Sequence, residues 1–526
     1  MKAVRIALRP LGRDIEVEEG APLQDALFPH GVEFPCGGQG RCRGCLVRVL
    51  DGELHAVGNR SDKLTDEELN AGWRQACRCR AESDVTLELA QWEAPILGDD
   101  STFSFQSGNG LGVAIDLGTT TLVGQLVDLA KGNVLAVRSA LNNQARHGAD
   151  IMTRIEFAQS PEGRRRLVKL IRAQLGKLVA ELIAAARAEP NDLKRVMLVG
   201  NTVMHHLFCD LDLEPLAALP FESPHLDPVD FQPADLDWNL NDACVIRFLP
   251  CIGGFVGSDV LGGIVATGMH ESSEPVALVD LGTNGEIAVG NRDGILCAST
   301  AAGPAFEGAK ISMGMRAATG AISRVEIEDG NLQCHVIGDE NTRGICGSGL
   351  VDAVASGLEL DLIQPSGRLP EGKDLILAEP VSLTQTDIRE LQLAKGAIAA
   401  GVRILSERRG GSEHALARVD LAGAFGNYLK LSSARRIGLI DQPTELVRPV
   451  GNAALLGAKM ALFEDDRELW DSVRRRVEHI GLGSDPEFMD TYVAEMSFPK
   501  NSPLQSSNTP GSQHSDSPTF QTSAAS

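Results

Sequence analysis

Three cysteines lie close together near the start of the chain, in the stretch FPCGGQGRCRGCLV. They are Cys36, Cys42 and Cys45, with the spacing C-x5-C-x2-C, and a fourth candidate follows in QACRCR at Cys77 or Cys79. Two thiolates three positions apart can bind one metal centre, and glycines let a loop wrap around a bulky inorganic core. Such a loop also exposes backbone N–H groups that can donate hydrogen bonds to cluster sulfurs. The stretch therefore indicates a metal centre, with an iron–sulfur cluster and structural zinc as the alternatives.

The arrangement of these cysteines favours iron over zinc. Structural zinc sites usually pair two C-x2-4-C or histidine-based knuckles, whereas this sequence has one knuckle and one distant leading cysteine. Plant-type ferredoxins carry C-x4-C-x2-C and a later cysteine, and the extra residue in the first gap here resembles the adrenodoxin-like branch of [2Fe–2S] ferredoxins. GWRQAC resembles the G-x-R-L-A-C segment of ferredoxin-like proteins, which implies Cys77 as the fourth ligand, with Cys79 as the alternative. The predicted cluster ligands are Cys36, Cys42, Cys45 and Cys77.

A second pair of motifs indicates nucleotide chemistry. VAIDLGTTT (113–121) and ALVDLGTNG (277–285) share the pattern apolar-apolar-Asp-Leu-Gly-Thr, while no GxxxxGK[ST] P-loop occurs. Each motif places an aspartate at the end of an apolar strand and follows it with a Gly-Thr turn. The N–H and hydroxyl groups of such a turn can bind phosphates, and the aspartate can hold Mg²⁺ through water. Two copies so far apart predict a duplicated architecture rather than a stacked repeat.

The two motifs resemble the phosphate loops of the actin, sugar-kinase and heat-shock ATPase superfamily, with loop 1 at 116–121 and loop 2 at 280–285. Residues 421–426, LAGAFG, resemble the adenosine motif of that superfamily. GGFVGSDVLGGIVATG (253–268) and VGNAALLGAKMAL (450–462) resemble its small-residue connecting helices. The resemblance implies two ribonuclease-H-like subdomains that close over Mg-ATP.

The same resemblance implies roles for individual residues. Asp116 and Asp280 are expected to orient Mg²⁺ or its waters, and Asp259, in the first connecting segment, is a candidate water-activating base. The expected phosphate and adenine contacts are residues of the three motifs: Gly118, Thr119, Thr120, Gly282, Thr283, Asn284, Gly423 and Gly426. Gly347, in RGICGSGLVDAV, is expected at a helix N-terminus that faces phosphate, with a packing turn as the alternative.

Apolar patterning divides the chain into five segments. Residues 1–95 are expected to form a β-grasp [2Fe–2S] ferredoxin-like domain, and 96–111 a polar linker. Residues 112–275 and 276–497 alternate apolar strands with amphipathic helices and are expected to be ATPase subdomains I and II. Residues 498–526 are rich in Ser, Pro, Thr and Gln and are expected to be a disordered tail. The predicted fold class is multidomain, α/β and α+β, with a duplicated ribonuclease-H-like ATPase after the ferredoxin domain.

The composition narrows the location and the partners. The 526 residues are 43% hydrophobic and 23% charged, as in ordinary globular proteins. The net charge of −22 argues against nucleic acid or an anionic membrane as the main partner. The start of the chain offers no signal-peptide core, and no run of about 18 apolar residues predicts a membrane span. Eleven cysteines, an odd number, make no disulfide framework in so long a chain, so we expect a cytoplasmic protein.

The fusion of a ferredoxin-like domain to this ATPase resembles the reductive activators of corrinoid proteins. Further segments carry the resemblance: NNQARHGADIMTRI, VGNTVMHHLF, LPCIGGFVGSDV, CASTAAGPAFEGAKISMGM, RGICGSGLVDAV and LTQTDIRELQLAKGAI. It implies ATP-dependent reduction of a corrinoid from Co(II) to Co(I) for methyl transfer, with one electron passing through a [2Fe–2S] cluster. The implied partners are a corrinoid-binding protein or corrinoid methyltransferase and an upstream low-potential electron donor. The implied cofactors are the cluster, ATP and Mg²⁺.

Three alternatives stay open in the sequence. The linker runs directly into loop 1, so an extra middle domain of some family members is expected to be absent, which leaves a homodimer open. His205 and His206 are candidate corrinoid contacts, with core packing as the favoured alternative. The alternative functions are ATP-driven electron donation to a non-corrinoid redox enzyme, against which the fused ferredoxin domain argues, and a small-molecule kinase with the same ATPase fold.

Overall fold

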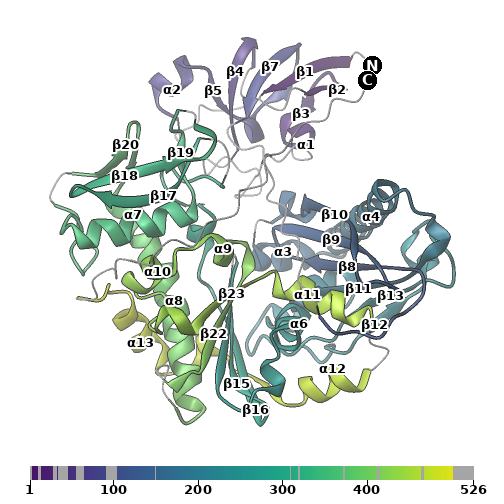
Figure 1. The fold of residues 1–526 in the computed structure, drawn as a ribbon. Coiled ribbons are helices and arrows are strands. Elements are labelled where there is room, and N and C mark those ends of the chain that lie inside the picture. The colour runs from purple at the N-terminus through teal and green to yellow at the C-terminus, as the bar shows by residue number, and fades with distance from the viewer. Residues whose placement is uncertain are drawn as a thin grey trace.

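The computed structural model describes fourteen stretches of the chain. They are residues 3–9, 13–27, 32, 45–54, 64–89, 103–148, 150–282, 284–308, 310–317, 320–339, 341–370, 373–411, 415–463 and 467–500. Figure 1 shows a small β-rich N-terminal domain above two larger α/β halves. We call them the N-terminal domain, the first half (β8 to α6) and the second half (β14 to α13).

The N-terminal domain is built on a five-stranded sheet in the order β2-β1-β7-β4-β5. The first two strands form a hairpin, because β1 and β2 pair antiparallel with Val4 opposite Val17. The last strand, β7, is the central strand of the sheet and pairs parallel with β1. The elements are β1 (Ala3–Arg9), β2 (Arg13–Glu18), β3 (Ala21–Pro22), α1 (Leu23–Leu27), β4 (Leu46–Gly52), α2 (Asp66–Asn70), β5 (Trp73–Gln75), β6 (Arg80–Ala81) and β7 (Val85–Leu89).

The first half contains a six-stranded sheet in the order β10-β9-β8-β11-β13-β12. Its long helix α4 begins after the N-cap Ser160. The apolar stripe of this helix, which includes Leu167, Ile171 and Leu175, packs against β9 and β10. The elements are β8 (Leu111–Leu117), β9 (Thr121–Asp128), β10 (Val134–Leu141), α3 (Ile151–Ala158), α4 (Pro161–Ala185), β11 (Leu193–Gly200), α5 (Thr202–Cys209), β12 (Val229–Phe231), β13 (Val245–Phe248) and α6 (Ser258–Thr267).

The second half repeats this plan. Its main sheet has the order β23-β22-β14-β15-β16-β24, and β14, β15, β16 and β22 pair as β8, β9, β10 and β11 do in the first half. The predicted duplication is therefore present. The main-sheet strands are β14 (Val276–Leu281), β15 (Gly285–Asn291), β16 (Gly294–Thr300), β22 (Arg418–Ala422), β23 (Val447–Gly451) and β24 (Val477–His479).

Two small sheets and seven α-helices accompany the main sheet in the described part of the second half. The sheets contain β17 (Ala321–Glu328), β18 (Asn331–Val336) and β19 (Gly344–Ile345), and β20 (Leu375–Ala378) and β21 (Val381–Leu383). The helices are α7 (Gly347–Glu359), α8 (Gln385–Arg408), α9 (Gly423–Tyr428), α10 (Leu431–Arg436), α11 (Ala453–Ala461), α12 (Arg467–Arg474) and α13 (Phe488–Glu495).

The two helices α6 and α11 pack against each other near the middle of the molecule (Figure 1). Although α11 follows the strand β23 of the second half, it lies on β8 and β11 of the first. The two helices meet backbone to backbone, because a Cβ atom built on Gly457 would lie 2.4 Å from the Cα atom of Gly262. The small residues of the two predicted connecting segments thus permit this close approach.

We expect Gly457→Ala to lower the free energy of unfolding by about 1–3 kcal/mol, because the added methyl meets backbone that has no room to give. The better helix propensity of alanine, worth about 1 kcal/mol, opposes this loss. Thermal unfolding measures the change. The matched control is Gly483→Ala, since a Cβ atom at Gly483 meets nothing within 4 Å. Equal midpoints for the two variants would contradict the packing argument.

Both predicted polar borders of the ATPase are partly packed onto it. In the predicted linker 96–111, Phe103 and Phe105 lie against Phe463, with ring centroids 5.4 and 4.4 Å away. In the segment predicted as a tail from residue 498, Phe498 is buried and its N–H donates to the Pro365 carbonyl at 2.8 Å. The body therefore continues past the predicted boundary at 498, because Phe498 supplies apolar surface to the core of the second half.

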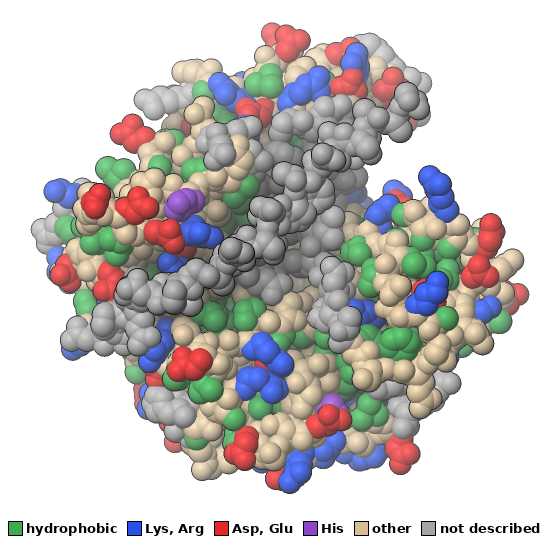
Figure 2. All heavy atoms as spheres, in the orientation of Figure 1, with side chains coloured by type: hydrophobic (Ala, Val, Ile, Leu, Met, Phe, Trp, Pro, Cys, Tyr) green, Lys and Arg blue, Asp and Glu red, His purple; other side chains and the backbone are tan. Residues whose placement is uncertain are grey.

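The surface carries both signs of charge. On the face seen in Figure 2, Lys and Arg side chains are scattered among Asp and Glu rather than gathered into one basic patch. None of the helices in the described stretches is long and apolar enough to cross a membrane.

Candidate cluster and nucleotide sites

Cys45 and Cys77 are brought close by backbone pairing between two segments. Strands β4 and β5 pair antiparallel with Leu46 opposite Gln75, and the Ala76 N–H donates to the Cys45 carbonyl at 2.9 Å. A short 3₁₀ turn at Ala76–Arg78 then carries Cys77, which packs at the edge of the apolar cluster that contains Cys45. Two of the four predicted ligands thus lie on neighbouring segments; the other two, Cys36 and Cys42, lie outside the described residues.

Cys79 has a different environment from Cys77. Its side chain is 3% exposed, and its Sγ lies 3.3 Å from the Gln75 carbonyl oxygen, to which the thiol donates. Burial raises the pKa of the Cys79 thiol to about 12, whereas Cys77 keeps part of its surface open. Because a cluster ligand must be a thiolate, the donor set of Cys45 and Cys77 fits a cluster better than one that includes Cys79.

The two predicted phosphate loops are tight turns at equivalent ends of the two central strands. In loop 1 the Gly118 N–H donates to the Thr121 carbonyl at 3.1 Å, and in loop 2 the Gly282 N–H donates to the Asn284 carbonyl at 3.2 Å. Loop 1 joins β8 to β9, and loop 2 joins β14 to β15. The structure thus places the two motifs as a duplicated pair of turns. Thr283 lies outside the described residues.

Two asparagines support loop 1 through contacts that sequence reasoning missed. Asn201 donates from Nδ2 to Thr119 Oγ1 at 2.9 Å, and Asn452 donates from Nδ2 to Asp116 Oδ2 at 2.8 Å. Each asparagine also caps a helix, because its Oδ1 accepts an N–H from the first turn of α5 or α11. The signal in the sequence is the tripeptide VGN, which stands before both helices.

Four acidic side chains from four elements lie near one another between the halves. Asp116 lies near the end of β8, Asp259 lies in the first turn of α6, and Asp280 and Glu286 are cross-strand partners in β14 and β15. Burial raises the pKa of Asp116 to about 6, and burial with nearby acids raises the pKa values of Asp259 and Asp280 to about 7. The pKa of Glu286 is raised well above its usual value for the same reasons. Sequence reasoning missed Glu286, although it closely follows the loop 2 motif.

The acids do not form a direct chelating site by themselves. In the part of the chain that the structure describes, no group of three or more His, Cys, Asp or Glu side chains is placed to hold a metal ion. Each of the four acids nevertheless keeps some contact with solvent. Water and phosphate oxygens could therefore complete the coordination of a cation held at this place.

The glycines of the adenosine motif and of α7 permit close backbone packing. Gly423 has a φ of +88°, and a Cβ atom there would lie 2.7 Å from Asp280 Oδ1, so this residue lies against the base of loop 2. Gly426, in α9, packs near the Leu421 carbonyl of the preceding strand β22. A Cβ atom on Gly347 would lie 1.8 Å from the Phe306 carbonyl oxygen, so no side chain fits at this position.

His205 and His206 are fully buried in the first half. The His206 ring lies within hydrogen-bond distance of the Thr202 carbonyl at 2.8 Å and of Ser223 Oγ at 2.7 Å. The His205 ring packs edge-on against Phe248. Burial lowers the pKa of His205 to about 3 and that of His206 to about 4. Both histidines pack in the core, which is the alternative that the sequence favours over a corrinoid contact.

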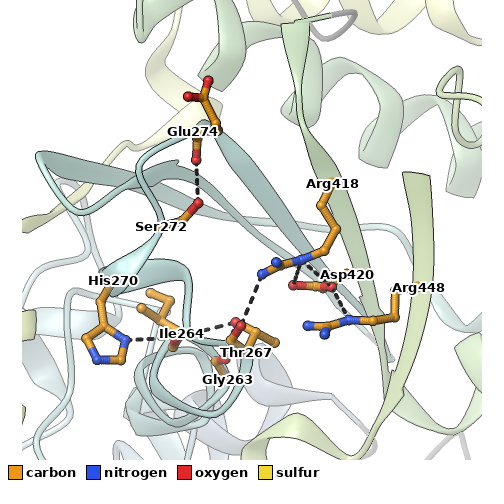
Figure 3. A network of polar contacts seen from close by, with 9 residues as sticks. All are labelled: Gly263, Ile264, Thr267, His270, Ser272, Glu274, Arg418, Asp420 and Arg448. Atoms are coloured by element: carbon orange, nitrogen blue, oxygen red, sulfur yellow. Dashed lines mark hydrogen bonds and ion pairs between the residues drawn. The ribbon is translucent and has the colours of Figure 1, made fainter. Parts of the chain in front are cut away.

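Helix α6, which carries Asp259 at its start, is anchored at its other end to the second half. Figure 3 shows Arg418 reaching from β22 to the end of this helix, where its Nη2 donates to the Thr267 carbonyl at 3.1 Å. Arg418 is itself oriented by Asp420, a buried carboxylate that also accepts from Arg448 at 2.9 Å. The helix that carries Asp259 is therefore fixed at its far end to β22 of the second half.

The raised pKa values predict how stability changes with pH. Between about pH 4 and pH 7 the folded protein holds protons on these acids that the unfolded chain has released, so their contribution destabilises the fold as pH rises. We expect Asp259→Asn to stabilise the nucleotide-free protein, by about 1–3 kcal/mol at pH 8 and much less at pH 5. Chemical denaturation at both pH values measures the difference. A gain that does not grow with pH would contradict the raised pKa.

Comparison with known proteins gives three consecutive family matches. A 2Fe-2S iron-sulfur cluster binding domain matches residues 6–82, the RACo middle region matches 111–272, and the C-terminal domain of RACo, the ASKHA domain, matches 274–508. The corrinoid activation enzyme RamQ of Eubacterium limosum is 31% identical over 598 aligned positions, which cover 95% of this chain and 100% of the relative. The chain belongs to the RACo family.

Two further similarities extend across most of this RACo-family chain. The [Co(II) methylated amine-specific corrinoid protein] reductase of Methanosarcina barkeri is 27% identical over 425 residues, 74% of this chain and 77% of the relative. A solved reductive activator for a corrinoid, iron-sulfur protein superposes with a TM-score of 0.68 at 27% identity and covers 94% of this chain and 98% of that one. The predicted fold class, a ferredoxin domain followed by an actin- and sugar-kinase-like ATPase, is confirmed.

The RACo middle-region match includes loop 1 and therefore corresponds to the first half of the ATPase, not to an additional domain. The alignment with RamQ has 598 positions, more than the 526 residues of this chain. RamQ thus contains residues without a counterpart here. That this RACo-family member lacks an extra domain between the linker and loop 1 stays a prediction.

Proposed function

We propose that this protein uses ATP hydrolysis to drive one electron through a [2Fe–2S] cluster onto the cobalt of a corrinoid protein, reducing Co(II) to Co(I). The observation that carries the proposal is that the ferredoxin domain rests on both halves of the ATPase. Leu141 and Ala145 of the first half pack into its apolar cluster, and Arg343 of the second half pairs with Glu88 at 3.3 Å. A change in the relative position of the halves must therefore affect the ferredoxin domain.

The coupling has a thermodynamic purpose. Reduction to Co(I) is uphill for ordinary donors, and a gap of about 100 mV costs about 2.3 kcal/mol for one electron. ATP binding and hydrolysis can supply this energy only if they favour different arrangements of the two halves. The packed helices α6 and α11 provide an element that both halves share, with Asp259 at the start of α6 and Asp116 bonded to the N-cap Asn452 of α11.

For the cluster we propose Cys36, Cys42, Cys45 and Cys77 as ligands. The neighbouring positions of Cys45 and Cys77 and the 2Fe-2S domain match at 6–82 support this set. A bound cluster supplies one-electron redox chemistry. The chain supplies the thiolates and the apolar surroundings of Cys45, which keep water from one side of the site.

For the nucleotide we propose Mg²⁺-ATP bound between loops 1 and 2. Asp116 and Asp280 would hold the cation through water, and Asp259 would accept a proton from the attacking water, in keeping with its raised pKa. The proposed phosphate and adenine contacts are Gly118, Thr119, Thr120, Gly282, Thr283, Asn284, Gly423 and Gly426, with Gly347 at the start of α7. The duplicated turns and the ASKHA match support this arrangement.

The partners follow from the reaction. We propose a corrinoid methyltransferase or its corrinoid-binding subunit as acceptor, supported by the names of the relatives, and an upstream low-potential protein as donor. A cytoplasmic location and a homodimer stay predictions.

Anaerobic ATP turnover tests the assignment against a small-molecule kinase. We expect a Co(II) corrinoid protein to stimulate ATP hydrolysis several-fold, while a panel of sugars leaves the rate unchanged and yields no phosphorylated product. Stimulation by a sugar with formation of a sugar phosphate would replace the proposal with the kinase alternative.

A further inference from the structure

One buried arginine lies directly beneath loop 1. The Arg154 side chain is 0% exposed; its Nη2 donates to the Thr119 carbonyl at 2.5 Å and its Nε donates to the Gly148 carbonyl at 2.9 Å. Its Nη1 lies 3.4 Å from both Gln144 Oε1 and Met204 Sδ. All these hydrogen-bond acceptors are neutral, although a buried cation is usually paired directly with a carboxylate. The carboxylate that acts on the Arg154 charge is that of Asp150, the N-cap of the same helix, and it accepts none of these hydrogen bonds. The structure therefore retains a costly buried positive charge against the backbone of a predicted phosphate loop.

A second side chain completes the attachment of loop 1. Asn142, also fully buried, donates from Nδ2 to the Gly118 carbonyl at 3.0 Å and from its backbone N–H to the Thr120 carbonyl at 2.8 Å. Together with Arg154, it holds the carbonyls of three consecutive loop residues. A shift of loop 1 would therefore break these hydrogen bonds or displace Asn142 and Arg154 with it.

The same segment contacts the ferredoxin domain. Leu141, at the end of β10, is buried in the apolar cluster that contains Cys45, and Ala145 packs against that cluster together with Cys77. The Leu141 carbonyl accepts from Gln174 Nε2 of α4 at 2.6 Å, which fixes the segment to the first half. The path from loop 1 to the cysteine segments is thus a short run of buried contacts.

The contact with the second half is weaker. There the Arg343–Glu88 ion pair has side chains that are 32% and 20% exposed. Partly exposed ion pairs contribute little to stability, whereas buried apolar contacts contribute more. If the two halves move relative to each other, we expect the ferredoxin domain to keep its apolar contact with the first half. The Arg343–Glu88 ion pair with the second half should break.

We propose that Arg154 and Asn142 are positioning residues that transmit the occupancy of loop 1 to the cysteine segments of the ferredoxin domain. The proposal rests on the proposed function for its purpose. Its physical content is separate: a ligand in loop 1 changes the backbone of 141–148, and that segment moves the Cys45 and Cys77 segments relative to the second half.

The test compares wild-type protein with Arg154→Met, which has a similar shape but lacks the charge and the donors. Arg172→Met is the matched control, because Arg172 lies on α4 of the same half and donates to the Phe208 carbonyl at 2.8 Å, away from loop 1. Hydrogen exchange of peptides 45–52 and 73–79 is followed with and without a non-hydrolysable ATP analogue at saturation. ATP turnover and Co(I) formation are measured on the same preparations.

We expect the analogue to change exchange at both peptides in the wild type and in Arg172→Met, and to have no effect on them in Arg154→Met. The yield of Co(I) per ATP hydrolysed should fall roughly ten-fold in Arg154→Met. Asn142→Ser provides a second variant with the same expected direction, in case the first does not fold. An unchanged exchange response in a folded variant would overturn the proposal. If the wild type responds in exchange but forms no Co(I), the proposed function fails while the coupling stands.

Discussion

Replacing Cys77 with serine is expected to abolish the visible absorption of a [2Fe–2S] cluster, while Cys79→Ser should leave the spectrum intact. Cys77 lies on a turn that is held to Cys45 by the hydrogen bond from the Ala76 N–H to the Cys45 carbonyl, and its side chain is partly exposed. The Cys79 thiol donates to the Gln75 carbonyl and is buried, with a pKa raised to about 12. A serine at Cys79 can make the same hydrogen bond, so this variant should fold.

The measurement is anaerobic purification followed by absorption spectroscopy and assays of iron and labile sulfide. Wild type and Cys79→Ser should each contain about two irons and two sulfides per chain, as the cluster type requires. Cys77→Ser should lose most of both. The reverse pattern would make Cys79 the ligand and would require the 76–79 turn to rearrange when the cluster binds.

Asp280→Asn is expected to lower ATP turnover by roughly 100-fold or more and at the same time to stabilise the nucleotide-free protein. The carboxylate lies near the end of β14 at the base of loop 2, beside Asp116 and Asp259, and its pKa is raised to about 7. Removing a charge that orients a metal ion and its phosphates costs several kcal/mol in the transition state. Removing the same buried charge from the unliganded protein relieves a penalty of about 1–3 kcal/mol at pH 8.

Steady-state ATP hydrolysis and thermal unfolding measure the two effects. Asp293→Asn is the control, since Asp293 is an exposed aspartate of the same half. It should leave both quantities unchanged. An Asp280→Asn protein that hydrolyses ATP normally, or that unfolds at a lower temperature than wild type, would contradict the account of the nucleotide site.

The sequence predicts those parts of the structure that depend on local pattern. The β1–β2 hairpin follows from alternation over a few residues, and the paired turns at Gly118 and Gly282 follow from a motif that stands twice in the chain. Helix α4 likewise follows from a continuous amphipathic pattern. In each case the deciding contacts lie within or next to the segment that predicts them.

The features that were missed depend on contacts between distant segments. Asn452 reaches Asp116 across 336 positions of the sequence. Arg154 donates to the Thr119 carbonyl of loop 1 from helix α3, whose sequence pattern is that of an ordinary amphipathic helix. The polar linker contains two aromatic residues, Phe103 and Phe105, whose partner Phe463 follows α11. Composition alone does not show which apolar residue of a polar stretch finds a partner in the folded chain.

The most direct test of the central claim is the formation of Co(I) under conditions in which the reductant alone cannot produce it. Wild-type protein, a Co(II) corrinoid protein and a reductant poised about 100 mV above the cobalt couple are mixed anaerobically, and the Co(I) absorption is followed. We predict Co(I) formation with ATP and none with ADP, a non-hydrolysable analogue or Cys77→Ser protein. Equal formation of Co(I) with and without ATP would contradict the account.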